Sequence, residues 1–342
     1  MGPSQILVAP GLRTSAGPGW RAGVAAALSV VAERPSLWLL GALGYLLRGG
    51  AVLLTLAILT LPSPISIRLM LGGYLGSYGF THDFYIAVAA GLALLLCLVA
   101  AAMVTSAVAD IVAFERFLRA PSARSALGAQ PVRPSAVGRR RLIGGMVIVQ
   151  LVGFLVLVAA AVPLVVMAGQ VTYEELMRPN LAGGALYQRV LAQLGLPLFA
   201  LLVALVVVEM VSAIACRRLM CHAYGLAGSS AADPARSRGM TMSALAAIGH
   251  GVRRPFVRPL STVSTTLLGW LAMLAVLAPL SWALGLAWSA VRAQFLAGLS
   301  PAALPVLLTT ATLLTVVWLG GLGLAGIASS LRAGLWTSEE LR

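Results

Sequence analysis

Long apolar segments separated by short polar ones run along the whole chain. Six of these segments contain almost no charged residue and are long enough to cross the hydrocarbon core of a bilayer, which takes about 20 residues of helix. They cover approximately residues 36–62, 84–112, 142–169, 194–216, 262–291 and 303–331. The pattern predicts an all-α, polytopic membrane helix bundle of about six transmembrane helices, with residues 1–342 forming a single membrane domain.

The polar segments alternate in arginine content. Nineteen arginines fall in the N-terminal arm, in segments 113–141 and 217–261 and at the C-terminus, whereas the polar segments between them hold four. Positively charged loops stay in the cytoplasm. Every basic residue is arginine, which we interpret as the coding bias of a GC-rich genome. We therefore expect a multi-pass protein of a prokaryotic plasma (inner) membrane with both termini cytoplasmic.

A weak three-fold pattern accompanies the spans. An Arg-Pro pair precedes each odd-numbered span, and small residues end each even-numbered span; the pairs are Arg34-Pro35, Arg133-Pro134 and Arg254-Pro255. Proline is tolerated in the first turn of a helix, and small residues let two helices approach closely in lipid. The spacing predicts three pseudo-repeated hairpins over 20–125, 130–230 and 239–342. The alternative is that such residues are simply common in membrane proteins of biased composition.

Two amphipathic segments precede spans 1 and 5, at 20–34 and 240–254. We expect them to form interfacial helices, with their apolar faces in the bilayer and their arginines near anionic headgroups on the cytoplasmic side. A plain helical extension of the following span is the alternative. The candidate interfacial contacts are Arg139, Arg140, Arg141, Arg253 and Arg254.

Composition excludes several kinds of protein. Apolar residues make up 60% of the chain and charged residues 10%, and the mean hydropathy is +0.95. A soluble fold is therefore excluded, since soluble domains carry about 25% charged residues. The net charge of +14 is explained by the loop arginines, so no nucleic-acid partner is expected. Cys216, Cys221 and His222 are too few for a zinc site, and we expect neither a metal nor a cofactor.

Charged residues inside the spans are the candidates for chemistry. Arg48 lies near the middle of the first span, and Glu209 lies at a similar depth in the fourth. Intramembrane charges face the interior of a bundle and usually pair. We predict that Arg48 pairs with Glu209, with Gln150 as a third member of an intramembrane polar site. This site is either a structural ion pair or part of a solute or proton path. Asp110 is expected to pair with a loop arginine at the interface.

No catalytic constellation is recognisable in the sequence. There is no phosphate-binding loop, no H-E-x-x-H motif and no G-x-S-x-G motif. No catalytic residue is therefore predicted, and we do not expect the protein to be an enzyme.

The segments ALSVVAERPSLWLLGALG and SAVADIVAFERFLRA carry a resemblance. They resemble poorly characterised bacterial six-span proteins that are similar to the membrane domain attached to some glycerophosphodiester phosphodiesterases. That resemblance supplies no functional residues, and the phosphodiesterase catalytic domain is not present. The layout is also similar to permease subunits of ABC-2-type exporters, which implies that segments 113–141 and 217–261 would dock on a partner ATPase.

From these observations we expect an integral plasma-membrane protein that acts as a non-enzymatic membrane component or scaffold. The alternative is a transporter, either the permease subunit of an ABC-type exporter or a carrier that uses the Arg48/Glu209 region.

Overall fold

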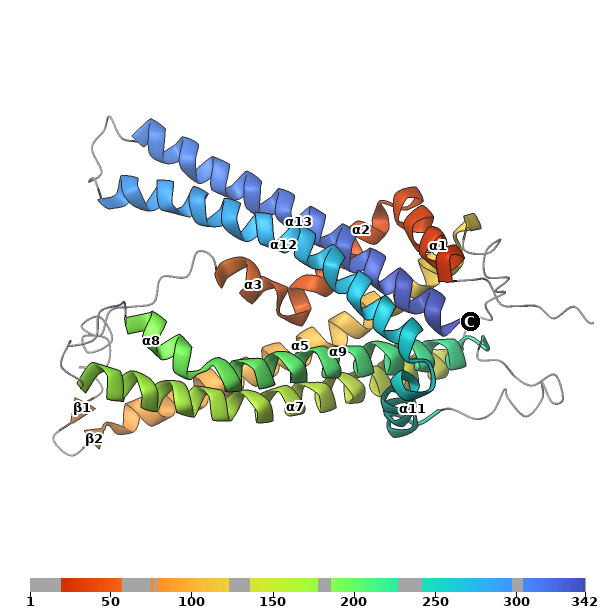
Figure 1. Ribbon diagram of the computed structural model, residues 1–342, viewed down its shortest axis with the longest axis horizontal. Helices are drawn as coiled ribbons and strands as arrows, with labels where there is room; N and C mark the ends of the chain where they lie inside the picture. The colour runs from red at the N-terminus through yellow and green to blue at the C-terminus, as the bar shows by residue number, and fades with distance from the viewer. Residues whose placement is uncertain are drawn as a thin grey trace, which may run out of the picture.

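The computed structural model describes residues 20–56, 75–76, 79–122, 136–177, 186–226, 242–296 and 304–341 (Figure 1). Several features predicted from the sequence lie outside these residues. They are the last part of the first predicted span, the pair Arg133-Pro134, and the centres of segments 113–141 and 217–261.

The chain is an all-α membrane bundle. Its helices are α1 (Trp20–Glu33), α2 (Ser36–Tyr45), the π-helical turn η1 (Leu46–Gly50), α3 (Ala51–Leu56), α5 (His82–Leu118), α7 (Ala136–Met177), α8 (Leu186–Gln193), α9 (Gly195–Ala223), α11 (Ala244–Val257), α12 (Pro259–Leu296) and α13 (Leu304–Glu340). Strand β1 (Leu75–Gly76) pairs antiparallel with β2 (Gly79–Phe80) just before α5.

In the described chain, six helical segments are long and apolar enough to cross a membrane. They are Ser36–Thr55, His82–Leu118, Gly138–Glu175, Gly195–Ala223, Pro259–Phe295 and Leu304–Glu340. The six predicted spans are therefore confirmed. The first of them combines α2, η1 and α3, and the other five extend beyond the predicted limits at one or both ends.

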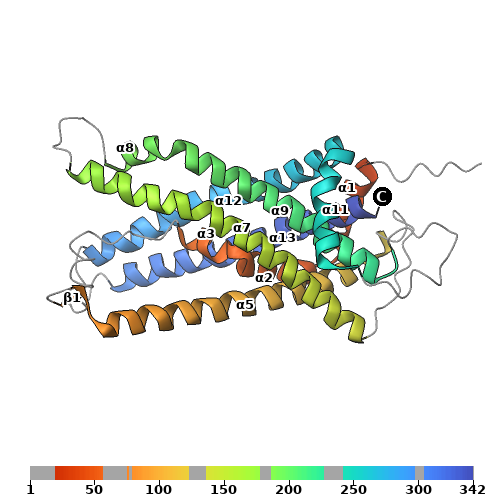
Figure 2. The same cartoon turned by 90° about the horizontal axis from the view of Figure 1, so that it is seen from below.

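The helices form two groups that meet at one end of the bundle. Helix α13 packs along α12, α2 and α1, while α7 packs along α9. The α12–α13 pair diverges from α7 and α9 toward the end opposite the C-terminus (Figures 1 and 2). We call the end that holds α1, α11 and the C-terminus the inner end, because it is the end that the arginine pattern predicts to be cytoplasmic. Much of the buried core lies there, in residues such as Phe114, Met146, Met220 and Leu335.

Close helix crossings depend on small residues, as the sequence indicates. A Cβ atom on Gly41 of α2 would collide with the backbone carbonyl of Gly326 in α13, and a Cβ on Gly326 would collide with α2. The Ser330 hydroxyl donates a hydrogen bond of 2.6 Å to the carbonyl of Leu37 across the same contact. The small residues near the end of the last span therefore bring two backbones together.

The outer halves of several spans are barely buried. In the most apolar stretch of α5 no residue is buried within the protein, and in that of α7 only 6% are. These apolar surfaces need lipid or another protein chain around them.

Two short helices precede spans 1 and 5 as predicted, and they differ in their surroundings. Helix α1 buries Ala27 and Val30 in a cluster with Phe117 and Leu335. Helix α11 is capped at its start by Ser243, whose side chain accepts from the amide of Ala246. It exposes an apolar strip containing Leu245 and Phe256, while its Gly251 contacts α9.

The three-hairpin pattern is only partly reflected in the packing. Helices α7 and α9 pack together, as do α12 and α13, but α2 packs more extensively against α13 than against α5. The pair Arg254-Pro255 precedes span 5, as the sequence indicates, but it lies inside α11 and not at the first turn of the span. The helix instead breaks at Arg258, and α12 begins at Pro259. The internal repeat stays a prediction.

Candidate functional site

Span 1 is broken within its membrane segment. Between α2 and α3 the backbone leaves helical geometry at Arg48 (φ −93°, ψ 22°) and at Gly49 (φ 95°, ψ 0°). A positive φ of this size is accessible to glycine at little cost. The Gly49-Gly50 pair therefore allows the break, and Arg48 lies directly at it.

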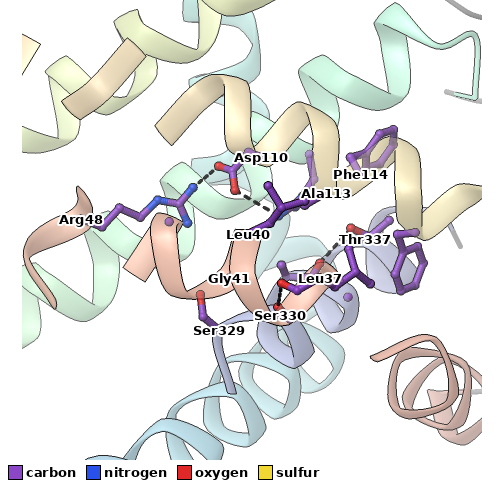
Figure 3. Close-up of a pocket in the computed structure, with 15 residues that line it drawn as sticks. Leu37, Leu40, Gly41, Arg48, Asp110, Ala113, Phe114, Ser329, Ser330 and Thr337 are labelled. Atoms are coloured by element: carbon purple, nitrogen blue, oxygen red, sulfur yellow. Dashed lines mark hydrogen bonds and ion pairs between the residues drawn. The ribbon is translucent and has the colours of Figure 1, made fainter. Parts of the chain in front are cut away.

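Arg48 forms an ion pair with Asp110 of α5 (Figure 3). Its Nε also donates to the Ser106 hydroxyl at 3.1 Å. Arg217, near the inner end of α9, has its guanidinium 4.0 Å from the other oxygen of Asp110. The expected partner of Asp110 was a loop arginine; its ion pair is with Arg48 of span 1, while Arg217, the first residue of the predicted segment 217–261, lies within α9.

The predicted pairing of Arg48 with Glu209 is wrong. Glu209 pairs with Arg332 of α13 instead. Depths counted along straight helices place Arg48 and Glu209 at similar levels in the membrane. The break in span 1 instead turns Arg48 toward α5. Gln150 is not among the contacts of either pair, and its side-chain nitrogen is buried without a hydrogen-bond partner in the described structure.

The two ion pairs lie near each other. Arg332 interacts electrostatically with both Arg48 and Asp110. Three arginines and two carboxylates from four of the spans therefore gather toward the inner end. Arg48 and Glu209 thus belong to two neighbouring ion pairs, and the cluster also contains Asp110, Arg217 and Arg332, but Gln150 is not among its contacts.

A small cavity of about 30 Å³ adjoins this cluster. Its walls come from α2, η1, α5, α9 and α13 and carry three charged side chains, those of Arg48, Asp110 and Arg217. Figure 3 shows Arg48 and Asp110 at this cavity. We call it the Arg217 cavity; its other lining residues include Gly41, Gly44, Phe114, Ser329, Ser330 and Thr337. A water molecule needs about 10–15 Å³ of such cavity space. The cavity therefore has room for a few waters or a small polar group.

A second charged cluster closes the inner end. Glu340, at the end of α13, receives Arg254 Nη1 at 2.7 Å and Arg218 Nη1 at 3.3 Å. Arg254 Nη2 also donates to the backbone carbonyl of Glu339 at 2.7 Å. His250 lies 3.4 Å from Glu340, and burial together with the neighbouring Arg218 and Arg254 lowers the pKa of His250. This shift favours the neutral form of the imidazole.

This second cluster corrects the interpretation of Arg254. It was expected to contact lipid headgroups, yet its side chain is only 9% exposed and points toward α13. The other candidate interfacial residues, Arg139, Arg140, Arg141 and Arg253, are exposed. Their contact with anionic lipid stays a prediction.

Tyr224, which follows α9, donates a 2.6 Å hydrogen bond to Glu115. The burial of Tyr224 and this hydrogen bond raise its pKa.

The sequence contains signals for some of what was missed. A Gly-Gly pair beside a charged residue inside an apolar span indicates a helix break. The paired acids Glu339 and Glu340 are natural partners for the arginine-rich inner segments, although nothing local shows which arginines they meet.

Within the described residues, no group of three or more His, Cys, Asp and Glu side chains is arranged to hold a metal ion. Comparison of the chain with protein-family models, with curated proteins and with solved structures finds no match.

Proposed function

We propose that this chain is a non-enzymatic carrier of the prokaryotic plasma membrane, with both termini cytoplasmic, whose solute site lies at the break in span 1. The observation that carries the proposal is the non-helical backbone at Arg48 and Gly49 beside the charge-lined Arg217 cavity. Non-helical backbone at membrane depth is tolerated where it is buried in protein or lines a water-filled cavity. Broken helices with charged groups at the break are how many carriers build their sites.

A purely structural role explains these features less well. An ion pair that only fixed helix register would need neither a helix break nor a cavity beside it. Here the break leaves the Arg48 side chain 47% exposed, although Asp110 opposite is 11% exposed. A residue held at a break and only half covered by protein is suited to meet a mobile partner.

The division of the helices into two groups also supports a carrier. Helix α13 packs against α12 and α2 in one group and α7 packs against α9 in the other, while α5 contacts both α2 and α7. The α12–α13 pair and the α7–α9 pair are tied at the inner end and diverge toward the opposite end (Figure 1). Carriers commonly expose a site by moving one group of helices against another.

Cysteine accessibility tests the proposal without knowledge of the solute. Gly44 lines the cavity, and a Cβ there meets nothing within 4 Å, so Gly44→Cys is accommodated. In a background with the three native cysteines replaced by alanine, a charged, membrane-impermeant thiol reagent is applied to vesicles of each orientation. We expect Gly44→Cys to react from both sides. Gly323→Cys, exposed in the apolar part of α13, is the matched control and stays unlabelled, since a thiolate does not form in lipid.

The scaffold interpretation gives the opposite result. In a static scaffold, Gly44→Cys reacts from one side only or from neither. Either outcome would reject the carrier and leave a structural membrane component as the better account.

A further inference from the structure

We propose that the Arg217 cavity is an anion site, in which Arg217 and Arg48 bind a small oxyanion group, either a carboxylate or a phosphate. As the substrate class of a carrier this inference rests on the proposed function, but the site itself does not require transport.

Arg217 is the first observation. The residue is 5% exposed and its side chain lines the cavity. In the described part of the chain its guanidinium makes no hydrogen bond, and its one ion contact, to Asp110, is 4.0 Å long. That distance is beyond hydrogen-bonding range. A guanidinium carries five N–H donors, and none of those of Arg217 makes a hydrogen bond within the described chain, so this cavity-lining side chain has donors available for a ligand.

The charge balance of the cavity is the second observation. Two guanidinium groups and one carboxylate line it. Asp110 is already engaged by Arg48, and the nearby Arg332 is neutralised by Glu209. One positive charge is therefore left over in a buried place. Burying a charge without a partner is costly, and a bound anion would offset this cost.

The shape and polarity of the cavity select the kind of anion. Its volume of about 30 Å³ accepts a compact group but not a bulky one. Guanidinium groups match the two oxygens of carboxylate and phosphate in a bidentate geometry. Ser330 and Thr337 already donate to backbone carbonyls, whereas the half-buried Ser329 on the same wall offers a further hydroxyl donor. These features favour an oxyanion whose remaining bulk lies outside the cavity.

Thermal unfolding of the purified full chain in detergent tests the site. Sodium phosphate is raised at constant ionic strength against sodium chloride, and sodium acetate is tested in the same way. A ligand that binds only the folded state raises Tm by an amount that grows with the logarithm of its concentration once this exceeds the Kd, here by roughly 2–4 °C. We expect this rise in the wild type and in Arg218→Gln, the matched control whose side chain meets Glu340 outside the cavity. Arg217→Gln is expected to lose it, with an affinity at least tenfold lower.

A second measurement does not depend on the stability of an arginine variant. Bound oxyanion should slow the modification of Gly44→Cys by the charged thiol reagent, and chloride at the same ionic strength should not. Equal Tm rises in the wild type and Arg217→Gln would show a general salt effect and overturn the proposal. Equal protection by chloride would overturn the preference for an oxyanion.

The source of the anion is resolved by comparing lipids with free ions. Delipidated protein is titrated with phosphatidylglycerol or with phosphatidylcholine in place of phosphate. An Arg217-dependent rise in Tm with phosphatidylglycerol alone assigns the site to a lipid headgroup, whereas a rise with free phosphate or acetate assigns it to a soluble anion. If the anion binds and Gly44→Cys is accessible from one side only, the carrier proposal fails while the site stands.

Discussion

Replacing Glu340 by glutamine is expected to destabilise the inner end of the bundle strongly. The change keeps the size and shape of the side chain but removes the negative charge that Arg254 and Arg218 approach at 2.7 and 3.3 Å. The Glu340 side chain is 2% exposed, so water cannot replace the lost interaction. Two guanidinium groups would then face a neutral amide.

The magnitude follows from this burial. Breaking a buried ion pair by removing one partner costs about 3–5 kcal/mol. Arg254 keeps a second partner, because its Nη2 also contacts the carbonyl of Glu339, and Arg218 is 30% exposed and can turn to solvent. We therefore expect the lower part of the range, a loss of about 3 kcal/mol in the free energy of unfolding.

The assay is equilibrium unfolding of the full chain in mixed detergent micelles. Glu33→Gln is the matched control, because Glu33 lies on an exposed part of α1, where its contact with Ser122 is 3.2 Å long. Exposed charges contribute about 0–1 kcal/mol, so this control should unfold nearly like the wild type. If Glu340→Gln unfolded no more easily than Glu33→Gln, the reasoning about the inner cluster would be refuted.

Three further changes test other parts of the fold by the same assay. Tyr224→Phe removes the hydrogen bond to Glu115 and should cost about 1.5–3 kcal/mol. The pKa of Tyr224 is raised in the folded state, so its contribution to the free energy of unfolding is complete below the unfolded pKa of about 10 and falls as pH rises above that value. Between pH 8 and 11, Tyr224→Phe should therefore lose less stability than the wild type does. Gly326→Ala should separate α2 from α13 at a cost of about 1–3 kcal/mol, while Gly320→Ala, where a Cβ meets open space, should be nearly neutral. Gly49→Ala forces a side chain onto a backbone with φ of 95° and should cost about 1–3 kcal/mol; no loss would show that the break in span 1 does not need this conformation.

The membrane architecture could be predicted from the sequence because it depends on local composition. An apolar segment of sufficient length has few alternatives to a membrane helix, since its backbone must satisfy its own hydrogen bonds in lipid. The small residues of the last span also indicated a close helix crossing, and Gly326 and Ser330 of this span contact α2.

The charge pairs could not be predicted in the same way. Matching residues by depth assumes straight helices, and the break at Gly49 violates this assumption for Arg48. Which arginines meet Glu340 depends on how α9, α11 and α13 converge. The partners that this convergence brings together lie up to 122 positions apart in the chain. The prediction that Arg254 contacts lipid headgroups failed for the same reason, because its partners Glu339 and Glu340 lie on a distant helix. An amphipathic pattern predicts a helix with two faces, but it does not say which face meets protein and which meets lipid.

The length of the spans has a consequence for the bilayer. Helix α7 has 42 residues and α5 has 37, and at about 1.5 Å per residue both are far longer than a hydrocarbon core of about 30 Å. The ion pairs described above are gathered toward the inner end, while the outer halves bury little against one another. The protein can therefore match membranes of different thickness by tilting or shifting its outer helices, without breaking an inner contact. Hydrophobic mismatch should change the spacing of the outer helix ends while the inner end keeps its structure.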